Sequence, residues 1–540
     1  MKRSSTSIMI LILLVSILLG ACTGQKDGNA TRGKTPADKG KQIKEGNQPD
    51  HSGEKTGWKK DTSPITFTML IDHSWYPKDT WGKDEISQEI TKRTGVNIEL
   101  GKTTDSSQLQ VLLAGDELPE LVFTDNLVER FHSPNICYAW DELIEEYAPE
   151  FMDLITPLEI VNNTAPDGHF YTIRTHFSGD EDWADPRNLP SPGTANFNIR
   201  TDILEGLGNP RLESLEDLVD IYKKVKTKYP DMLIHVKRPN FSSAIAETMG
   251  LVPPTNPYSD GNKVYLGISD PGTIDYFRFV NNLVRKGYLD METTTYELNQ
   301  LTELANAGKI FAGENIKANN EVFREKGQDY EMQTIENVLT YKGEIRYKML
   351  DIGIGWSSFF ITKKCKDPER AIRFAEFLKS PEGDELTQWG VEGVHYTLNE
   401  DGLLERPEKY ASLQAQEDAG LGLWYFQASR LAEGISVTSR ALSDPDQESL
   451  VKWLQNVKPY TERNFALFFA VPQAETKAMT MQAKIGDLIE KATPELFNAS
   501  TDKELDQKFE GLYKACEEEG LKELEKGMTR EYIKAKDRYK

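Results

Sequence analysis

The chain has 540 residues but only four cysteines and seven histidines. Cys22, Cys137, Cys365 and Cys516 are far apart and contain no C-x-x-C pair, so the spacing of a structural metal site is missing. The histidines are also scattered, and the sequence has no H-E-x-x-H and no G-x-S-x-G motif. We therefore expect no metal site and no catalytic serine, at most one disulfide, and cysteines that serve as small buried apolar residues.

Basic residues are also in deficit. The sequence has 64 Lys and Arg against 86 Asp and Glu, which gives a net charge of −22. Nucleic-acid-binding proteins carry basic faces that neutralise phosphates, so no nucleic-acid partner is expected. An acidic surface instead fits an exported protein that stays soluble and monomeric. No apolar run after the first 21 residues is long enough to span a bilayer.

The first 22 residues have the pattern of an export signal. Lys2 and Arg3 precede an apolar run over residues 8–19, which ends in Gly20-Ala21-Cys22. This ending resembles the lipobox of bacterial lipoproteins, in which the cysteine becomes the lipidated first residue. The sequence thus predicts a signal peptide over residues 1–21 and a lipid on Cys22 that holds the chain at the extracellular face of the cell membrane. The alternative is an ordinary secretory signal followed by a chance cysteine.

Residues 22–60 are rich in Gly, Lys, Asp, Asn, Gln, Pro and Ser and have almost no apolar side chains. Such a segment cannot bury enough area to fold, so we expect a disordered tether. Within it, residues 28–35 match the phosphate-loop pattern G-x-x-x-x-G-K-[ST]. A polar segment precedes the match and Pro36 follows it, so the required strand and helix are missing and the match is interpreted as chance.

The folded part begins with an alternation of strand and helix patterns. Apolar runs at residues 65–71, 96–100 and 119–123 predict three strands, and helical spacing lies between them. This β-α-β-α-β order predicts an α/β sheet covered by helices. Ligands of such sheets bind beyond the carboxyl ends of the strands. That rule places four residues on the ligand side: Trp75, Trp81, Asp125 and Asn126.

Seven further segments carry a resemblance in their order and spacing. They are residues 112–120, 124–126, 165–168, 198–202, 355–356, 371–383 and 389–396. Together with the lipobox, they make the chain similar to the extracellular solute-binding lipoproteins of bacterial ATP-driven (ABC) sugar importers. Within that family it most resembles the long oligosaccharide binders, which include the alginate binders.

The resemblance implies a two-lobed periplasmic-binding-protein-like α/β fold of type II, with an oligosaccharide in the cleft between the lobes. Residues 61–175 and 355–410 would form one lobe, and residues 176–354 and 411–540 the other. The closed protein would deliver its sugar to the permease subunits of an ABC transporter, without a cofactor. Alginate-like members carry a calcium loop after the helix that matches residues 214–228. Tyr229-Pro230-Asp231-Met232 stands there instead, so calcium is not expected.

A sugar ring has an apolar C–H face, which aromatic rings cover, and hydroxyl groups, which Asp, Asn and Arg bind. On this basis the expected ligand contacts are Trp75, Trp81, Asp125, Asn126, Arg200, Trp356, Tyr396, Trp424 and Tyr425. For each aromatic residue the alternative is a place in the core, and for Asp125 and Arg200 it is a turn cap or an ion pair. Arg174, beside His176, is a further residue that could bind a uronate carboxylate.

The sequence therefore predicts a binding protein and not an enzyme. A secreted glycoside hydrolase stays an alternative, because 86 acidic residues could include a catalytic carboxylate pair. A peptide-binding lipoprotein is the second alternative.

Overall fold

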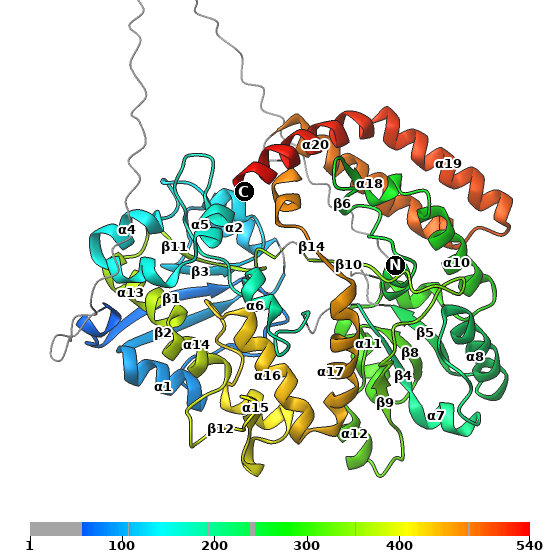
Figure 1. Ribbon diagram of the computed structural model, residues 1–540, viewed down its shortest axis with the longest axis horizontal. Helices are drawn as coiled ribbons and strands as arrows, with labels where there is room; N and C mark the ends of the chain where they lie inside the picture. Colours follow the sequence, from blue (N-terminus) through cyan, green and yellow to red (C-terminus); the bar gives the residue numbers. More distant parts are fainter. Residues whose placement is uncertain are drawn as a thin grey trace, which may run out of the picture. The chain divides into compact units, whose positions relative to one another are not determined.

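The first of two four-stranded sheets has the strand order β11-β3-β1-β2 (Figure 1). It consists of β1 (Ile65–Ile71), β2 (Val96–Lys102), β3 (Leu121–Thr124) and β11 (Ser358–Ile361). β1 is parallel to β2 and β3, whereas β11 runs antiparallel to β3. Helices α1 (Glu85–Thr94) and α2 (Gln108–Ala114) connect the three parallel strands. The predicted β-α-β-α-β order is confirmed.

This computed structural model describes residues 57–105, 107–191, 195–237, 243–351, 353–472 and 476–539. The predicted signal peptide, Cys22 and the phosphate-loop match lie outside the described residues. Within the described residues, no helix is both long and apolar enough to cross a membrane.

Local sequence signals explain where α1 begins and ends. The Asp84 side chain accepts a hydrogen bond from the Ser87 amide at 2.8 Å, which caps the first turn. Ile86 and Ile90, four residues apart, are both buried. Gly95 ends the helix with φ of 74°, and a Cβ there would lie 2.2 Å from the Thr62 carbonyl oxygen. Only glycine fits this close approach, and the chain then enters β2 at once.

The core of the first sheet includes side chains from residues 419–426, which the predicted division places with the second sheet. It packs the sheet against α4 (Trp140–Tyr147), α13 (Pro368–Lys379) and α14 (Pro381–Gln388). Ala419, Leu421, Trp424 and Phe426 belong to this same core, although residues 411–540 were assigned to the other lobe. The indole N–H of Trp424 donates to Asp84 at 3.0 Å, which ties this segment to the start of α1. Residues 419–426 thus pack with the first sheet, whereas the predicted division places them with the second.

The second sheet has the order β5-β8-β4-β9, with β4 (Phe197–Arg200), β5 (Leu233–Lys237), β8 (Ile310–Glu314) and β9 (Met332–Thr334). β5 and β8 are parallel, and β4 is antiparallel to both β8 and β9. Its core includes side chains of α8 (Leu215–Lys228) and α10 (Thr273–Arg285).

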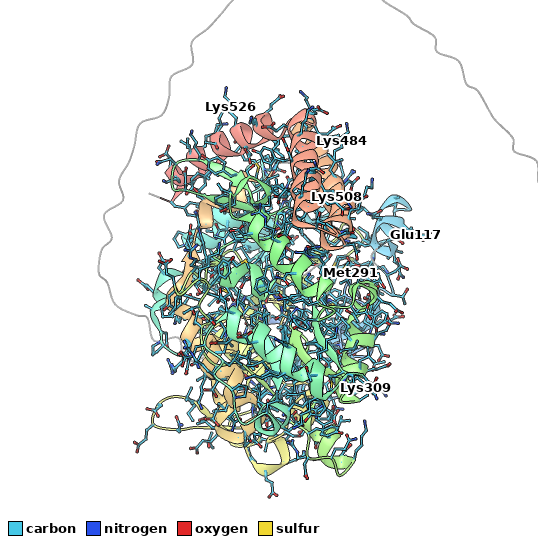
Figure 2. The ribbon with its side chains drawn as sticks, turned by 90° about the vertical axis from the view of Figure 1, so that its right-hand side faces the viewer. Glu117, Met291, Lys309, Lys484, Lys508 and Lys526 are labelled. Carbon is cyan, nitrogen blue, oxygen red and sulfur yellow. The ribbon has the colours of Figure 1, made fainter. Side chains whose placement is uncertain are left out.

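Three helices from the C-terminal part complete this second core: α18 (Lys477–Phe497), α19 (Asp502–Glu518) and α20 (Leu521–Arg538). They pack against one another (Figure 1), and Lys484, Lys508 and Lys526 lie on their outer side (Figure 2). α20 also packs against β7 (Val264–Leu266). The Glu525 carboxylate accepts from the Leu266 amide at 3.1 Å and from the Ser269 hydroxyl at 2.6 Å.

The remaining elements are short or connect the two sheets. The helices are α3 (Val128–Phe131), α5 (Pro157–Asn163), α6 (Asp180–Ala184), α7 (Thr201–Gly206), α9 (Ala244–Thr248), α11 (Leu298–Asn306), α12 (Asn320–Glu325), α15 (Leu413–Ala419), α16 (Arg430–Ser443) and α17 (Pro445–Val457). The strands are β6 (Pro257–Ser259), β10 (Met349–Asp351), β12 (Thr397–Leu398), β13 (Leu404–Glu405) and β14 (Thr461–Arg463). The 3-10 turns are η1 (Gly57–Lys60), η2 (Pro149–Leu154), η3 (Gly267–Ser269), η4 (Met291–Thr295), η5 (Glu408–Tyr410), η6 (Lys458–Tyr460) and η7 (Phe465–Ala470).

The turn η1 lies within the range predicted as a disordered tether, so the tether prediction extends four residues too far. The Trp58 ring meets the Phe377 ring edge-on, with centroids 4.7 Å apart. Arg373 donates to the Gly57 carbonyl oxygen at 3.0 Å. Trp58 is the large apolar side chain of this polar stretch, and its packing on α13 orders the turn.

Replacement of Trp58 by Ala is expected to lower the free energy of unfolding by about 2 kcal/mol, because it removes a half-buried aromatic ring from α13. Urea unfolding followed by circular dichroism measures the change. Lys83→Ala, at an exposed position, is the control and should stay within about 0.5 kcal/mol of the parent. Equal stability of the Trp58 variant and the control would show that η1 does not belong to the folded body.

Candidate functional site

A pocket of about 400 Å³ lies at the carboxyl edge of the first sheet. Three parallel strands end at this edge, so the residues that follow β1, β2 and β3 meet there. β11 is antiparallel, so its beginning reaches the same edge, together with Trp356 and Ser357, which directly precede the strand. The residues that line the pocket are Asp72, His73, Ser74, Trp75, Thr103, Asp105, Asp125 and Asn126.

Aromatic rings form one side of this site. Trp75 is 55% exposed and stacks on His73, with centroids 5.1 Å apart and ring planes at 29°. The Trp356 ring lies 5.1 Å from His73 and 6.1 Å from Trp75. Tyr425 continues the row, 6.0 Å from Trp356. A large exposed ring such as that of Trp75, beside polar side chains, is typical of a binding site.

His176 holds Trp356 in place. The Trp356 indole N–H donates to Nδ1 of His176 at 3.1 Å. Burial lowers the pKa of His176 to about 4, so at neutral pH the ring is uncharged and Nδ1 is free to accept. The residue has φ of 59°, a backbone conformation that histidine tolerates better than most residues. The neighbouring Thr175 hydroxyl donates to the Tyr425 carbonyl oxygen at 2.6 Å, so one short segment positions both rings.

The polar side of the pocket includes three aspartates. Asp72 is 7% exposed, and its Oδ2 accepts from the Thr124 hydroxyl at 3.0 Å. Its Oδ1 has no hydrogen-bond donor among the described residues, and burial raises the pKa of this carboxyl group. His73 Nδ1 lies 3.7 Å from a carboxylate oxygen of Asp125, and burial lowers the pKa of His73. Ser74, Thr103 and Asn126 on the same wall can both donate and accept, so the hydroxyl groups of a bound molecule can take either role.

Arg174 lies beside this site and not among the residues that line it. Its guanidinium is 5.1 Å from the ring centroid of Phe468 in η7. Burial lowers its pKa, whereas the charges of Glu129 and Asp125 act in the opposite direction. Its positive charge thus faces two carboxylates of the protein itself.

Five of the residues predicted as ligand contacts come together here. Asp125, Asn126 and Trp75 line the pocket, and Trp356 and Tyr425 flank it with half-buried rings. Their contact with a ligand stays a prediction.

The other three aromatic predictions fall in the cores, which corrects them. Trp424 has no exposed surface, and Trp81 and Tyr396 are also buried. The Trp81 and Trp424 rings pack edge-on at 4.7 Å, and each indole N–H is already used, by Thr91 and Asp84 respectively. Trp81 and Trp424 belong to the core of the first sheet, and Tyr396 packs with Leu404 and Ile435 in a smaller cluster.

Arg200 is also corrected, because its guanidinium is fully engaged elsewhere. It is buried at the end of β4 in the second sheet. Both oxygens of Asp202 accept from it at 2.6 Å, and the Gly308 carbonyl accepts at 3.0 Å. The ring of Tyr330 lies 4.0 Å from its central carbon. The ion-pair alternative is the one that the structure supports.

Sequence reasoning missed several members of the site. Thr103 and Asp105 follow β2 directly, so the strand-end rule that selected Trp75 and Asp125 would have found them. His73 and Ser74 stand in the same loop as Trp75. His176 gave no signal, because its role depends on a contact with a residue 180 positions away.

The cysteines behave as expected. Cys137, Cys365 and Cys516 are free and buried. Among the described residues, no three His, Cys, Asp or Glu side chains gather into a group that could hold a metal ion.

Comparison with known proteins finds similarity in sequence and in fold. No protein-family model matches the chain. The polygalacturonan/rhamnogalacturonan-binding protein YtcQ of Bacillus subtilis is 22% identical over 368 residues, which cover 64% of this chain and 69% of that protein.

Several solved structures are similar over most of the chain. The calcium-free alginate-binding protein AlgQ2 has a TM-score of 0.64 at 17% identity and covers 89% of this chain and 100% of its own. The Streptococcus pneumoniae ABC-transporter substrate-binding protein FusA, in complex with kestose, has a TM-score of 0.65 at 15% identity, over 88% of this chain and 100% of its own. The chain thus has the mixed α/β solute-binding-protein fold, as predicted.

The buried, neutral His176 predicts a pH dependence of stability. Its pKa is about 4 in the folded protein and about 6.5 in an unfolded chain, so the unfolded state binds more protons between these values. This group should therefore remove up to about 3 kcal/mol of stability as the pH falls from 6.5 to 4.

His176→Asn keeps an acceptor for Trp356 and tolerates the positive φ, but does not titrate. Its unfolding free energy should fall by about 2 kcal/mol less than that of the parent over the same pH range. Chemical unfolding at a series of pH values makes the comparison. Parallel pH curves for the two proteins would contradict the assignment of a buried, uncharged His176.

Proposed function

We propose that this protein is an extracellular solute-binding protein that captures an oligosaccharide and delivers it to the permease of an ABC importer. The observation that carries the proposal is the exposed Trp75 ring, which continues through His73 to Trp356 beside a pocket of carboxylate and amide acceptors. Aromatic faces cover the C–H side of a sugar, and oxygen acceptors take its hydroxyl groups.

The comparisons support this function over the alternatives. Proteins with this fold that bind kestose, alginate and galacturonans are named as binding proteins or transporter components. A glycoside hydrolase would share the sugar but release product, and a peptide binder would not respond to sugars. The protein is thus proposed to bind without turnover and to need no cofactor.

The two sheets, each with its own core, support a two-lobed arrangement. One lobe comprises residues from Gly57 to Thr175 and from 355 to about 428, and the other comprises the second sheet and its helices. A ligand held at the edge of the first sheet would be enclosed when the lobes close, which removes water and strengthens its hydrogen bonds.

The proposal includes a lipid on Cys22 that anchors the protein to the membrane. An anchored monomer stays close to the permease that it serves, at the extracellular face of the cell membrane. The sequence pattern around Cys22 is the support for this part.

Binding is tested by titration of the purified protein with a panel of oligosaccharides, followed by tryptophan fluorescence and by product analysis. We expect saturable binding without hydrolysis. Trp75→Ala should weaken binding at least about tenfold, because it removes the exposed stacking ring, and should leave the melting temperature nearly unchanged.

Leu442→Ala is the matched control, since Leu442 is 56% exposed in α16. It should leave binding unchanged. Product release would identify an enzyme, and a response to peptides with none to sugars would identify a peptide binder.

The anchor is tested in cells with Cys22→Ser. This substitution removes the thiol that a lipid would modify, so the protein should move from the membrane fraction to the soluble exported fraction. Incorporation of labelled fatty acid into the parent and its loss in the variant measure the same point. Thr23→Ala is the control and should stay in the membrane fraction. If the parent and the Cys22 variant fractionate equally, the protein has no lipid anchor at Cys22, and residues 1–21 are an ordinary secretory signal.

A further inference from the structure

The charge of the pocket is one-sided. Asp72, Asp105 and Asp125 line it, and none of the described residues that line it is a Lys or Arg. His73 is the basic group on its wall, and burial lowers the pKa of His73, which leaves it uncharged at neutral pH. A hydrogen bond from Ser107 lowers the pKa of Asp105, so this carboxylate is charged under the same conditions.

An independent observation points to what the pocket lacks. Asp72 is more than nine-tenths buried, yet its Oδ1 has no donor among the described residues. A buried acceptor without a partner costs free energy. That oxygen has almost no exposed surface, so the acceptors that a ligand reaches directly are the exposed carboxylates of Asp105 and Asp125.

We propose that the sugar ring held in this pocket carries no carboxylate, and that Asp105 and Asp125 accept from its hydroxyl groups and exclude uronate rings. The inference rests on the proposed function and adds a ligand class to it: oligosaccharides whose pocket-bound unit is a neutral sugar.

Two physical effects act against a uronate. Its carboxylate can only accept hydrogen bonds, whereas the hydroxymethyl group that it replaces can donate one to an aspartate. Its negative charge would also stand close to those of Asp105 and Asp125, which repel it. Arg174 does not compensate, because it lies outside the pocket lining and already faces Asp125 and Glu129.

The test uses matched pairs of oligosaccharides that differ only in the acid group. Suitable pairs are mannan and mannuronan oligomers, cello- and cellouronate oligomers, and methyl-esterified and free galacturonan oligomers. The last pair is chosen because the Bacillus relative is named for galacturonans. Calorimetric titration of the full protein at neutral pH and low salt gives each dissociation constant.

We expect the tightest ligand of the panel to be uncharged, and within any bound pair the neutral member to bind at least about tenfold tighter. Equal or tighter binding of a uronate member overturns the inference and leaves the proposed function standing. Failure of every oligosaccharide to bind overturns the proposed function itself, and the inference with it.

Asp125→Asn keeps the size and an acceptor but removes the charge. It should reduce the preference for the neutral member at least about threefold, chiefly through tighter binding of the acid. Asp105→Asn is a second variant with the same expected direction, in case the first unfolds. Asp116→Asn is the matched control, because Asp116 is highly exposed beyond the last turn of α2 and does not line the pocket. An unchanged preference in both pocket variants would contradict the proposed role of the aspartates.

Discussion

The candidate site depends on the direction of four strands. Because β1, β2 and β3 are parallel, the loops that follow them must meet at one edge of the sheet. β11 comes back from a point about 230 residues later, in the opposite direction, so its beginning and not its end reaches this edge. If β11 were parallel, Trp356 would lie at the far edge. Strand direction thus decides that rings from two distant parts of the chain share one surface.

The aromatic surface is also held rigidly from behind. Trp356 donates a hydrogen bond to the uncharged His176. The Thr175 hydroxyl donates to the carbonyl oxygen of Tyr425 and so fixes the second ring. Gly355 makes this possible, because a Cβ there would lie 2.2 Å from the Thr175 carbonyl oxygen. Rings that are positioned before a ligand arrives lose little conformational freedom on binding, so more of the stacking energy is kept as affinity.

Sequence patterns predicted the parallel part of the first sheet well, because its three strands and the two helices between them have a clear local period. The strand-end rule also placed Trp75, Asp125 and Asn126 on one side of that sheet. Sequence patterns could not separate Trp424 from Tyr425, which are neighbours in the chain. One ring is buried on Trp81 and the other borders the site, and only the tertiary contacts decide which is which. Arg200 likewise needed the position of Asp202 to be recognised as an ion-pair partner.

The contact of α20 with β7 has a consequence for biogenesis. Thr529 and Glu525 bind backbone groups some 260 positions earlier in the chain, and the same helix supplies side chains to the second core. Contacts at such separation form slowly, because a long loop must close before they bring any gain. A ribosome would have to finish α20 before that core could be sealed. The second core therefore stays open until the last helix has been made, so much of the chain remains unfolded throughout its synthesis.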